Sequence, residues 1–139
     1  MRFVIAADED RPVVHHVVRT LAERGHEATL LPIGIWADVA TRAARAVAAG
    51  DFDQGVVMCW TGTGVSIAAN KVRGIRAAHC TDVVEARNAR EHNDANVLCL
   101  GGRMIGIEPA KALALVFLKT DFAGGRHQKR VEKIMGLER

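Results

Sequence analysis

The chain has 139 residues, of which 49% are apolar and 25% charged, with a formal net charge of +3 at pH 7. This length suffices for one hydrophobic core but not for two, so we expect a single domain over residues 1–139. Acidic and basic residues alternate along most of the chain, which gives no indication of a nucleic-acid partner. No apolar run approaches the roughly 18 residues of a membrane span, and the start is too short for a signal peptide. We therefore expect a cytoplasmic protein with no membrane partner.

Apolar runs alternate with amphipathic or alanine-rich stretches along the chain. Strands are expected over residues 2–7, 26–32, within 52–59, over 75–80 and over 97–100. Helices are expected over residues 12–24, 37–49, from about 64, from 81 or 82 to 91, over 108–119 and from about 127. Pro12 suits a first helical turn, and Thr81 or Asp82 suits an N-cap. Strands alternating with helices predict βαβ units, and hence an α/β fold with a five-stranded parallel sheet covered on both faces.

Right-handed crossovers bring the carboxyl ends of parallel strands to one edge of the sheet, where such folds bind ligands. We expect polar groups there from residues 8–10, 34–36, 59–64 and 101–103, together with residues 90–94 at the end of the fourth helix. His92 and Arg103 each have a plain surface role as the alternative interpretation. Residues 126–130 are locally basic.

The segment over residues 59–71, Cys-Trp-Thr-Gly-Thr-Gly-Val-Ser-Ile-Ala-Ala-Asn-Lys, is the most informative part of the chain. It follows a buried strand, and Gly62 and Gly64 permit a tight turn into a helix. Such a turn presents backbone N–H groups at the positive end of a helix dipole, which can hold a phosphate or a developing oxyanion. Two interpretations of Cys59 stay open: a nucleophile or base beside an oxyanion site, or an ordinary small buried residue.

The three cysteines, Cys59, Cys80 and Cys99, are odd in number and have no metal-like spacing. Each follows an apolar run, so we expect reduced thiols near strand ends rather than disulfides or a metal site.

Four motifs follow one another in the second half of the chain. They are residues 61–64 with 66–71, residues 74–77, residues 90–98, and residues 124–127 followed by 130–132. With these motifs in this order, the chain resembles the ribose-5-phosphate isomerase B family, which includes galactose-6-phosphate isomerase subunits. The resemblance covers nearly the whole length. It implies a three-layer Rossmann-like fold, a homodimer or homotetramer, and aldose–ketose isomerisation of a small sugar without metal or cofactor.

The resemblance also implies roles for individual residues. Cys59 would take the proton from the carbon beside the carbonyl, giving a cis-enediolate, and Thr61 would shuttle or orient a hydroxyl proton. His92 with Asp8 would open the cyclic sugar. The remaining residues implied to bind substrate are Gly62, Thr63, Gly64, Ser66, Asn93, Arg103, Arg126 and Arg130. Some of these arginines would reach in from a partner subunit through the C-terminal helix.

The N-terminal third departs from the family pattern. The family usually has Asp-His-Ala-Gly after the first strand, with the His helping to bind phosphate, whereas this chain has Asp8-Glu9-Asp10-Arg11. Trp36 falls about where a longer family loop has Tyr, and Trp60 replaces a Gly. We predict that Glu9, Trp36 and Trp60 reshape the substrate pocket. Glu9 would repel phosphate, pair with Arg126 or Arg130, or bind a sugar hydroxyl. The alternative is that Glu9 faces solvent and both indoles only fill space.

The sequence thus leaves three functional hypotheses. The first is an isomerase of a phosphorylated sugar of four to six carbons. The second is the same chemistry on a sugar without phosphate or with another polar group. The third is a non-catalytic subunit of a mixed oligomer.

Overall fold

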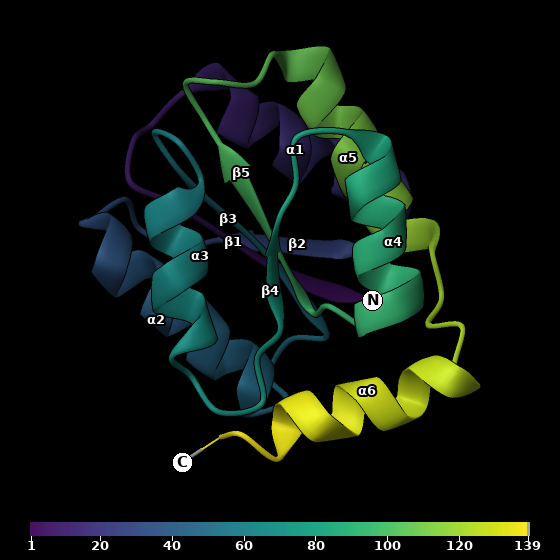
Figure 1. Cartoon of the computed structure of the whole chain (residues 1–139). Coiled ribbons are helices and arrows are strands. Elements are labelled where there is room, and N and C mark those ends of the chain that lie inside the picture. Colours follow the sequence, from purple (N-terminus) through teal and green to yellow (C-terminus); the bar gives the residue numbers. More distant parts are fainter. Residues whose placement is uncertain (139) are drawn as a thin grey trace.

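Five strands alternate with six helices in the computed structural model, which describes residues 1–138 (Figure 1). The strands are β1 (Arg2–Ala7), β2 (Glu27–Leu30), β3 (Gln54–Cys59), β4 (Ala77–His79) and β5 (Val97–Gly101). The helices are α1 (Pro12–Glu23), α2 (Trp36–Ala48), α3 (Thr63–Asn70), α4 (Val83–Asn93), α5 (Ile107–Lys119) and α6 (Arg126–Met135).

All strand pairs are parallel, and the sheet order is β2-β1-β3-β5-β4. The predicted five-stranded parallel sheet is therefore confirmed. β3 lies at its centre, where Cys59 is level with Gly101 of β5. The end of the strand that carries Cys59 is thus flanked by the loops that follow β1 and β5.

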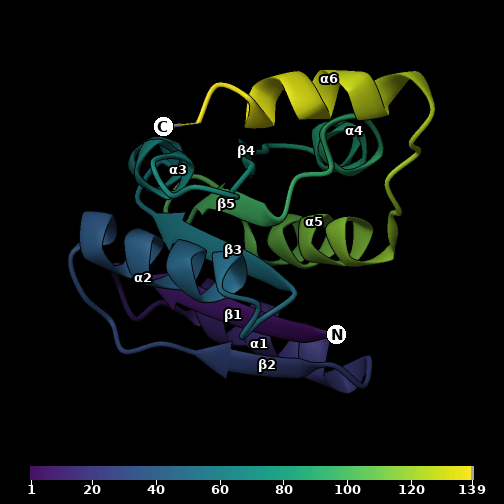
Figure 2. The same cartoon turned by 90° about the horizontal axis from the view of Figure 1, so that it is seen from below.

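Helices cover both faces of the sheet, as the α/β pattern predicts (Figure 2). Alternate residues of β1 point to opposite faces, as in any strand. Phe3 and Ile5 pack in one core with α1, α4 and α5, whereas Val4 packs in a second core with α2 and α3. The two cores hold the sheet between them and make the three layers.

The structure adjusts several predicted boundaries by one to three residues. Pro12 is the first residue of α1, and the Asp82 side chain accepts a hydrogen bond from the Glu85 N–H, 2.8 Å away, as an N-cap does. β2 and β4 are shorter than predicted. Trp36, expected in a turn, is instead the first residue of α2.

The side chain of Asn70 binds the outer edge of β4. Its Nδ2 donates to the Ala77 carbonyl, 2.9 Å away, and its Oδ1 accepts from the Ala77 N–H, 2.8 Å away. Because Asn70 is the last residue of α3, these two bonds fasten the end of that helix to the strand beside it (Figure 1).

α6 lies at the amino end of the sheet, below α4 in the view of Figure 1 and alongside it in Figure 2. Arg76, which immediately precedes β4, donates to the carbonyls of Asn93 and Asp94 and to Sδ of Met135. Glu138 accepts from the Gly74 N–H, 2.8 Å away. These contacts fix the C-terminal segment at the end of the sheet opposite Cys59. Among residues 1–138, no helix is both long and apolar enough to cross a membrane.

Candidate active site

β3 ends at Cys59, which is 6% exposed, and the chain turns back over the sulfur. Gly62 adopts the left-handed conformation, with φ of +87°. In this conformation its N–H donates to Cys59 Sγ, 3.2 Å away. A positive φ strains any residue with a side chain, so the glycine is needed to aim this donor at the thiol. The arrangement favours the functional interpretation of Cys59, because an N–H donor aimed at sulfur stabilises negative charge there.

The loop after β5 holds this turn in place. The Gly102 N–H donates to the Cys59 carbonyl at 2.7 Å, and the Arg103 N–H donates to the Trp60 carbonyl at 3.2 Å. Gly101 passes so close that a Cβ on it would lie 2.6 Å from the Thr61 carbonyl oxygen. Two loops separated by about forty residues of sequence therefore form one interlocked unit.

Helix α3 begins directly after the turn. The Thr63 N–H donates to Thr61 Oγ1 at 3.2 Å, which fixes the Thr61 side chain at the helix N-terminus. A Cβ on Gly64 would lie 2.9 Å from Cε3 of Trp36, so the indole packs closely against the helix start. Ser66, in the first turn of α3, is half-buried. Thr61 and Thr63 are exposed above the turn.

Burial separates the three free thiols. It raises the pKa of Cys80 to about 12, with smaller contributions from Glu85 and Asp82. Burial also raises the pKa of Cys99 well above the ordinary value. Both of these thiols therefore stay protonated near neutral pH, and Cys59 is the thiol that receives a backbone N–H at the sheet edge.

Asp8 follows β1 and lies beside the end of β3, since its N–H donates to the Met58 carbonyl at 3.3 Å. Burial raises the pKa of the Asp8 carboxyl, and the neighbouring Glu9 carboxylate adds to the shift. Arg103 opposes part of it. Asp8 consequently holds a proton to higher pH than an exposed aspartate does, which suits a group that must exchange one.

Glu9 forms a bidentate ion pair with Arg103. Nε of Arg103 lies 2.7 Å from one carboxylate oxygen, and Nη2 lies 2.6 Å from the other. The guanidinium also lies 4.0 Å from the ring centroid of Trp60. The Arg103 hydrogen bonds lower the pKa of Glu9. The predicted pairing of Glu9 with Arg126 or Arg130 is wrong within one chain, because both arginines lie on α6 at the other end of the sheet.

A second polar cluster lies at the amino end of the sheet. His92 and Asn93 end α4, and with Arg126, His127 and Arg130 of α6 they line a cavity of about 410 Å³. The His92 and His127 rings stack with centroids 4.5 Å apart and an interplanar angle of 16°. Burial lowers the pKa of His127, as do His92, Arg126 and Arg130.

The expectation that residues 90–94 share the edge with Cys59 is therefore wrong for a single chain. In a βαβ unit the helix runs antiparallel to its strands, so the end of α4 returns to the amino end of the sheet, where β5 begins. The predicted site residues thus form two groups. The group at the carboxyl end of the sheet comprises Asp8, Glu9, Trp36, Cys59–Gly64 and Arg103. The group at the amino end comprises His92, Asn93, Arg126 and Arg130.

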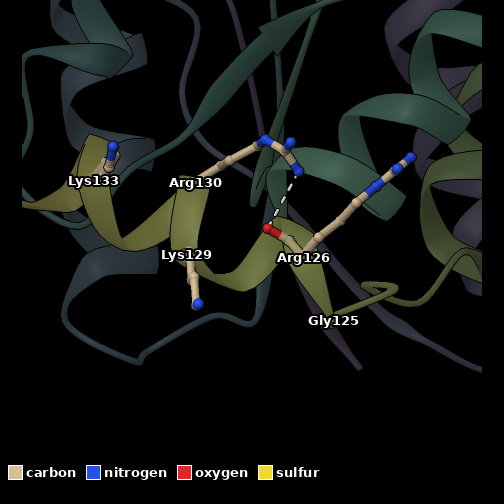
Figure 3. Close-up of a pocket in the computed structure, with 5 residues that line it drawn as sticks. All are labelled: Gly125, Arg126, Lys129, Arg130 and Lys133. Atoms are coloured by element: carbon tan, nitrogen blue, oxygen red, sulfur yellow. Dashed lines mark hydrogen bonds between the residues drawn. The ribbon is translucent and has the colours of Figure 1, made fainter.

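The basic face of α6 forms a further cavity of about 520 Å³, lined by Gly125, Arg126, Lys129, Arg130 and Lys133. Figure 3 shows the guanidinium groups of Arg126 and Arg130 on the same side of α6, with Lys129 pointing away. Nη1 of Arg130 donates to the Arg126 carbonyl at 3.3 Å. Two forked cations on one helix face can bind an anion such as phosphate.

Comparison with known proteins decides the family. Residues 4–134 match the family model described as Ribose/Galactose Isomerase. The chain belongs to this family. It is 44% identical over 131 residues to ribose-5-phosphate isomerase B of Escherichia coli K12, covering 89% of this chain and 87% of that one. It is 46% identical over 100 residues to D-erythrulose-4-phosphate isomerase of Pectobacterium atrosepticum, covering 72% of this chain and 66% of that one.

Solved structures of the same family superimpose closely. The type B ribose 5-phosphate isomerase of Trypanosoma brucei matches with a TM-score of 0.94 at 42% identity, covering 99% of this chain and 98% of the other. Ribose-5-phosphate isomerase B of Clostridium thermocellum gives the same TM-score and identity, covering 99% and 97%. The Rossmann-like fold expected from the resemblance is confirmed.

Two histidines to which the sequence assigned no role lie near the candidate site residues. His127 stacks on His92, and His79 packs against Gly62 at the edge of the sheet that carries Cys59. The rule that polar residues at strand ends mark the ligand edge also selects His79, which is the last residue of β4. His127 belongs to the motif over residues 124–127, but its contact with His92 depends on how α6 packs against α4.

Proposed function

We propose that the protein is an aldose–ketose isomerase that acts on a small phosphorylated sugar through a cis-enediolate. The family supports this reaction class, and the relatives named above are sugar-phosphate isomerases. The observation that carries the chemistry is the Gly62 N–H, 3.2 Å from the Cys59 sulfur at the start of α3. A base next to preorganised donors is what the removal of a proton beside a carbonyl requires.

In the proposed mechanism, Cys59 takes the proton from the carbon beside the carbonyl and returns it to the neighbouring carbon. The N–H groups around Gly62 and Gly64 stabilise the negative charge that develops on oxygen. Thr63 and Ser66 complete this first turn of α3. Thr61, held by the Thr63 N–H, orients a sugar hydroxyl.

The full site is proposed to form between two copies of the chain. Within one copy, Cys59 and Asp8 lie at the opposite end of the sheet from His92 and Asn93. A homodimer that places the α4 and α6 ends of one copy over the Cys59 edge of the other would complete the site. His92 with Asp8 would then open the sugar ring, Asn93 would bind hydroxyls, and Arg126 and Arg130 would bind the phosphate.

A second candidate is an isomerase of a sugar without phosphate. It is favoured by one observation: Glu9 already binds the Nε and Nη2 edge of Arg103, so a phosphate at this edge of the guanidinium would have to displace a carboxylate. In that case Glu9, Trp36 and Trp60 would form the wall that selects the sugar. The placement of Cys59 beside the Gly62 donor weighs against a purely non-catalytic subunit.

The proposed function can be tested by solvent-deuterium exchange followed by NMR, using erythrose 4-phosphate, ribose 5-phosphate, galactose 6-phosphate and the same sugars without phosphate. We expect the natural protein to exchange at least one phosphorylated sugar. Cys59→Ala should lower that rate by at least about a hundredfold, the lower range for general acid–base catalysis. Cys80→Ala and Cys99→Ala are the matched controls and should stay within about threefold of the natural protein, because these thiols remain protonated in the core. Undiminished exchange by Cys59→Ala would exclude the mechanism.

A further inference from the structure

The imidazole of His79 lies against the turn that holds Cys59. A Cβ placed on Gly62 would lie 2.7 Å from Nε2 and 2.8 Å from Cδ2 of His79, so the ring packs directly on the Gly62 Cα. The N–H of the same glycine donates to the Cys59 sulfur. Gly62 thus contacts the His79 imidazole through its Cα and the Cys59 thiol through its N–H.

His79 also lines a cavity beside this turn. The cavity holds about 290 Å³ and is lined by Thr61, Thr63, His79, Cys80, Thr81, Gly101, Met104 and Ile105. Its floor includes Gly101, the residue level with Cys59 in the sheet. Thr61 and Thr63, at the start of α3, belong both to this cavity and to the turn over Cys59. The cavity therefore adjoins the place where the reacting carbons would lie.

The sheet order gives the candidate site two chemically different sides. From Cys59 on β3, the neighbouring strand β1 leads to Asp8 and Glu9, and the opposite direction leads across β5 to His79 on β4. Parallel strands lie about 4.8 Å apart, so His79 is two strands, about 10 Å, from the Cys59 strand. The β1 side carries the Glu9–Arg103 ion pair, whereas the cavity on the β4 side is lined by threonine hydroxyls, the Cys80 thiol and the His79 imidazole.

The His79 imidazole and the Cys80 thiol are the two acid–base side chains that line the cavity. The Cys80 thiol is held protonated by burial. The nearby carboxylate of Glu85 on α4 already accepts hydrogen bonds from the Thr81 N–H, 2.9 Å away, and from the Thr81 hydroxyl, 2.5 Å away. The mechanism proposed above gives His79 no role. That mechanism also names no acid or base for one of its proton transfers.

That step is the movement of a proton between two oxygens. When Cys59 removes the C2 proton of an aldose, the negative charge goes to O1 while O2 keeps its hydrogen. Before Cys59 can protonate C1 to give the ketose, O2 must lose its proton and O1 must gain one. A positioned acid–base group accelerates such transfers by about 10²–10⁴-fold.

We propose that His79 relays this proton through the Thr61 hydroxyl, an inference that rests on the proposed function. Thr61 Oγ1 accepts the Thr63 N–H, which leaves its own O–H free to donate. The O2 proton passes through Thr61 to the His79 imidazole, and the imidazole then returns a proton through Thr61 to O1. No atom or electron is gained or lost, since His79 and Thr61 end as they began. His79 acts through Thr61 and so is a positioning residue for the reaction.

The test separates proton abstraction at carbon from proton movement between the oxygens. In D₂O, NMR follows two rates for the sugar phosphate that the natural protein exchanges fastest among erythrose 4-phosphate, ribose 5-phosphate and galactose 6-phosphate. One rate is deuterium entry into recovered aldose, and the other is formation of ketose. His79→Gln keeps the size and polarity of the side chain but removes its proton transfer. We expect this variant to lose at least about tenfold in ketose formation but less than about threefold in exchange, so the ratio of the two rates changes.

His79→Phe preserves an aromatic ring against Gly62 and should change the ratio in the same direction. Met104→Leu is the matched control, because it alters the wall of the same cavity without removing an acid or base, and its ratio should stay that of the natural protein. A fall of both rates by the same factor in His79→Gln and His79→Phe would mean that His79 only packs the turn, and unchanged rates would give it no part in the reaction. Either result overturns the relay. If the natural protein shows no exchange that depends on Cys59, the proposed function fails first and the relay fails with it.

Discussion

Glu9 and Arg103 form a bidentate ion pair although 94 residues of sequence separate them. The pair joins the loop after β1 to the loop after β5, and Trp60 stacks on the guanidinium. Both Glu9 and Trp60 therefore hold the Arg103 guanidinium in position, and the Glu9 carboxylate neutralises part of its charge. A phosphate that approached Arg103 would have to compete with Glu9.

Replacing Glu9 should therefore strengthen anion binding. We expect Glu9→His and Glu9→Gln to bind inorganic phosphate and ribose 5-phosphate about three to ten times more tightly, because an exposed ion pair contributes modestly but its removal frees the Arg103 fork. Calorimetric titration with phosphate measures this. Glu108→Gln, which removes another exposed carboxylate that pairs with a Lys, is the control and should leave binding unchanged. Efficient turnover of ribose 5-phosphate by the natural protein, together with a lower rate for Glu9→His, would instead place Glu9 in a working phosphosugar site.

Mixing two inactive variants should restore activity if the site is shared between copies. In a two-fold dimer of Cys59→Ala with His92→Ala, one site carries both changes and the other carries neither. Random mixing makes half of the dimers mixed, so we expect about one quarter of the natural activity after joint refolding. Each variant refolded alone is the control. Light scattering that found only a 15.0 kDa species, or a mixture no more active than its parts, would contradict the shared site.

His92→Ala should harm substrates that cyclise far more than substrates that cannot. If His92 opens the sugar ring, its loss should lower the rate about a hundredfold on ribose 5-phosphate but less than about threefold on erythrose 4-phosphate. Erythrose 4-phosphate stays open because the C4 oxygen that would close a five-membered ring carries the phosphate. Initial rates on both sugars give the comparison. Equal losses on the two sugars would assign His92 to the central proton transfer or to the architecture of the α4 and α6 ends.

Gly62→Ala should abolish activity while Gly74→Ala should not. Both glycines have a positive φ, +87° and +88°, so each alanine carries a similar backbone strain of about 1 kcal/mol. Only at Gly62 would the new methyl group also displace His79 and the Gly101 backbone and move the donor that faces Cys59. Thermal unfolding compares the strain, and exchange rates compare the chemistry. Equal activity of the two variants would show that the position of the Gly62 N–H is unimportant.

Local sequence signals predicted the sheet well because its buried strands are dense in apolar residues. A short apolar run such as Val56–Met58 is stable mainly as a buried strand. Pro12 and Asp82 mark helix starts, because Pro needs no N–H in the first turn and the Asp side chain caps a free N–H. The same reasoning placed Cys59 correctly at the carboxyl edge of the central strand.

The parts that sequence did not predict depend on tertiary geometry. Residues 90–94 are an exception, because a helix in a βαβ unit runs antiparallel to its strands and the predicted alternation already places the end of α4 at the amino end of the sheet. The partner of Glu9 was misassigned among three arginines because only the packing of the loops after β1 and β5 decides it. The stack of His92 on His127 likewise depends on where α6 lies.

The two bonds between the Asn70 side chain and Ala77 have a consequence for how the protein associates. β4 is the outermost strand on its side of the sheet, and an unpaired strand edge is a template on which another chain can add a strand. Asn70 occupies the outward N–H and carbonyl of Ala77, as a neighbouring strand would. Addition of another strand at Ala77 is thereby opposed, because it would have to displace both Asn70 bonds and release the end of α3.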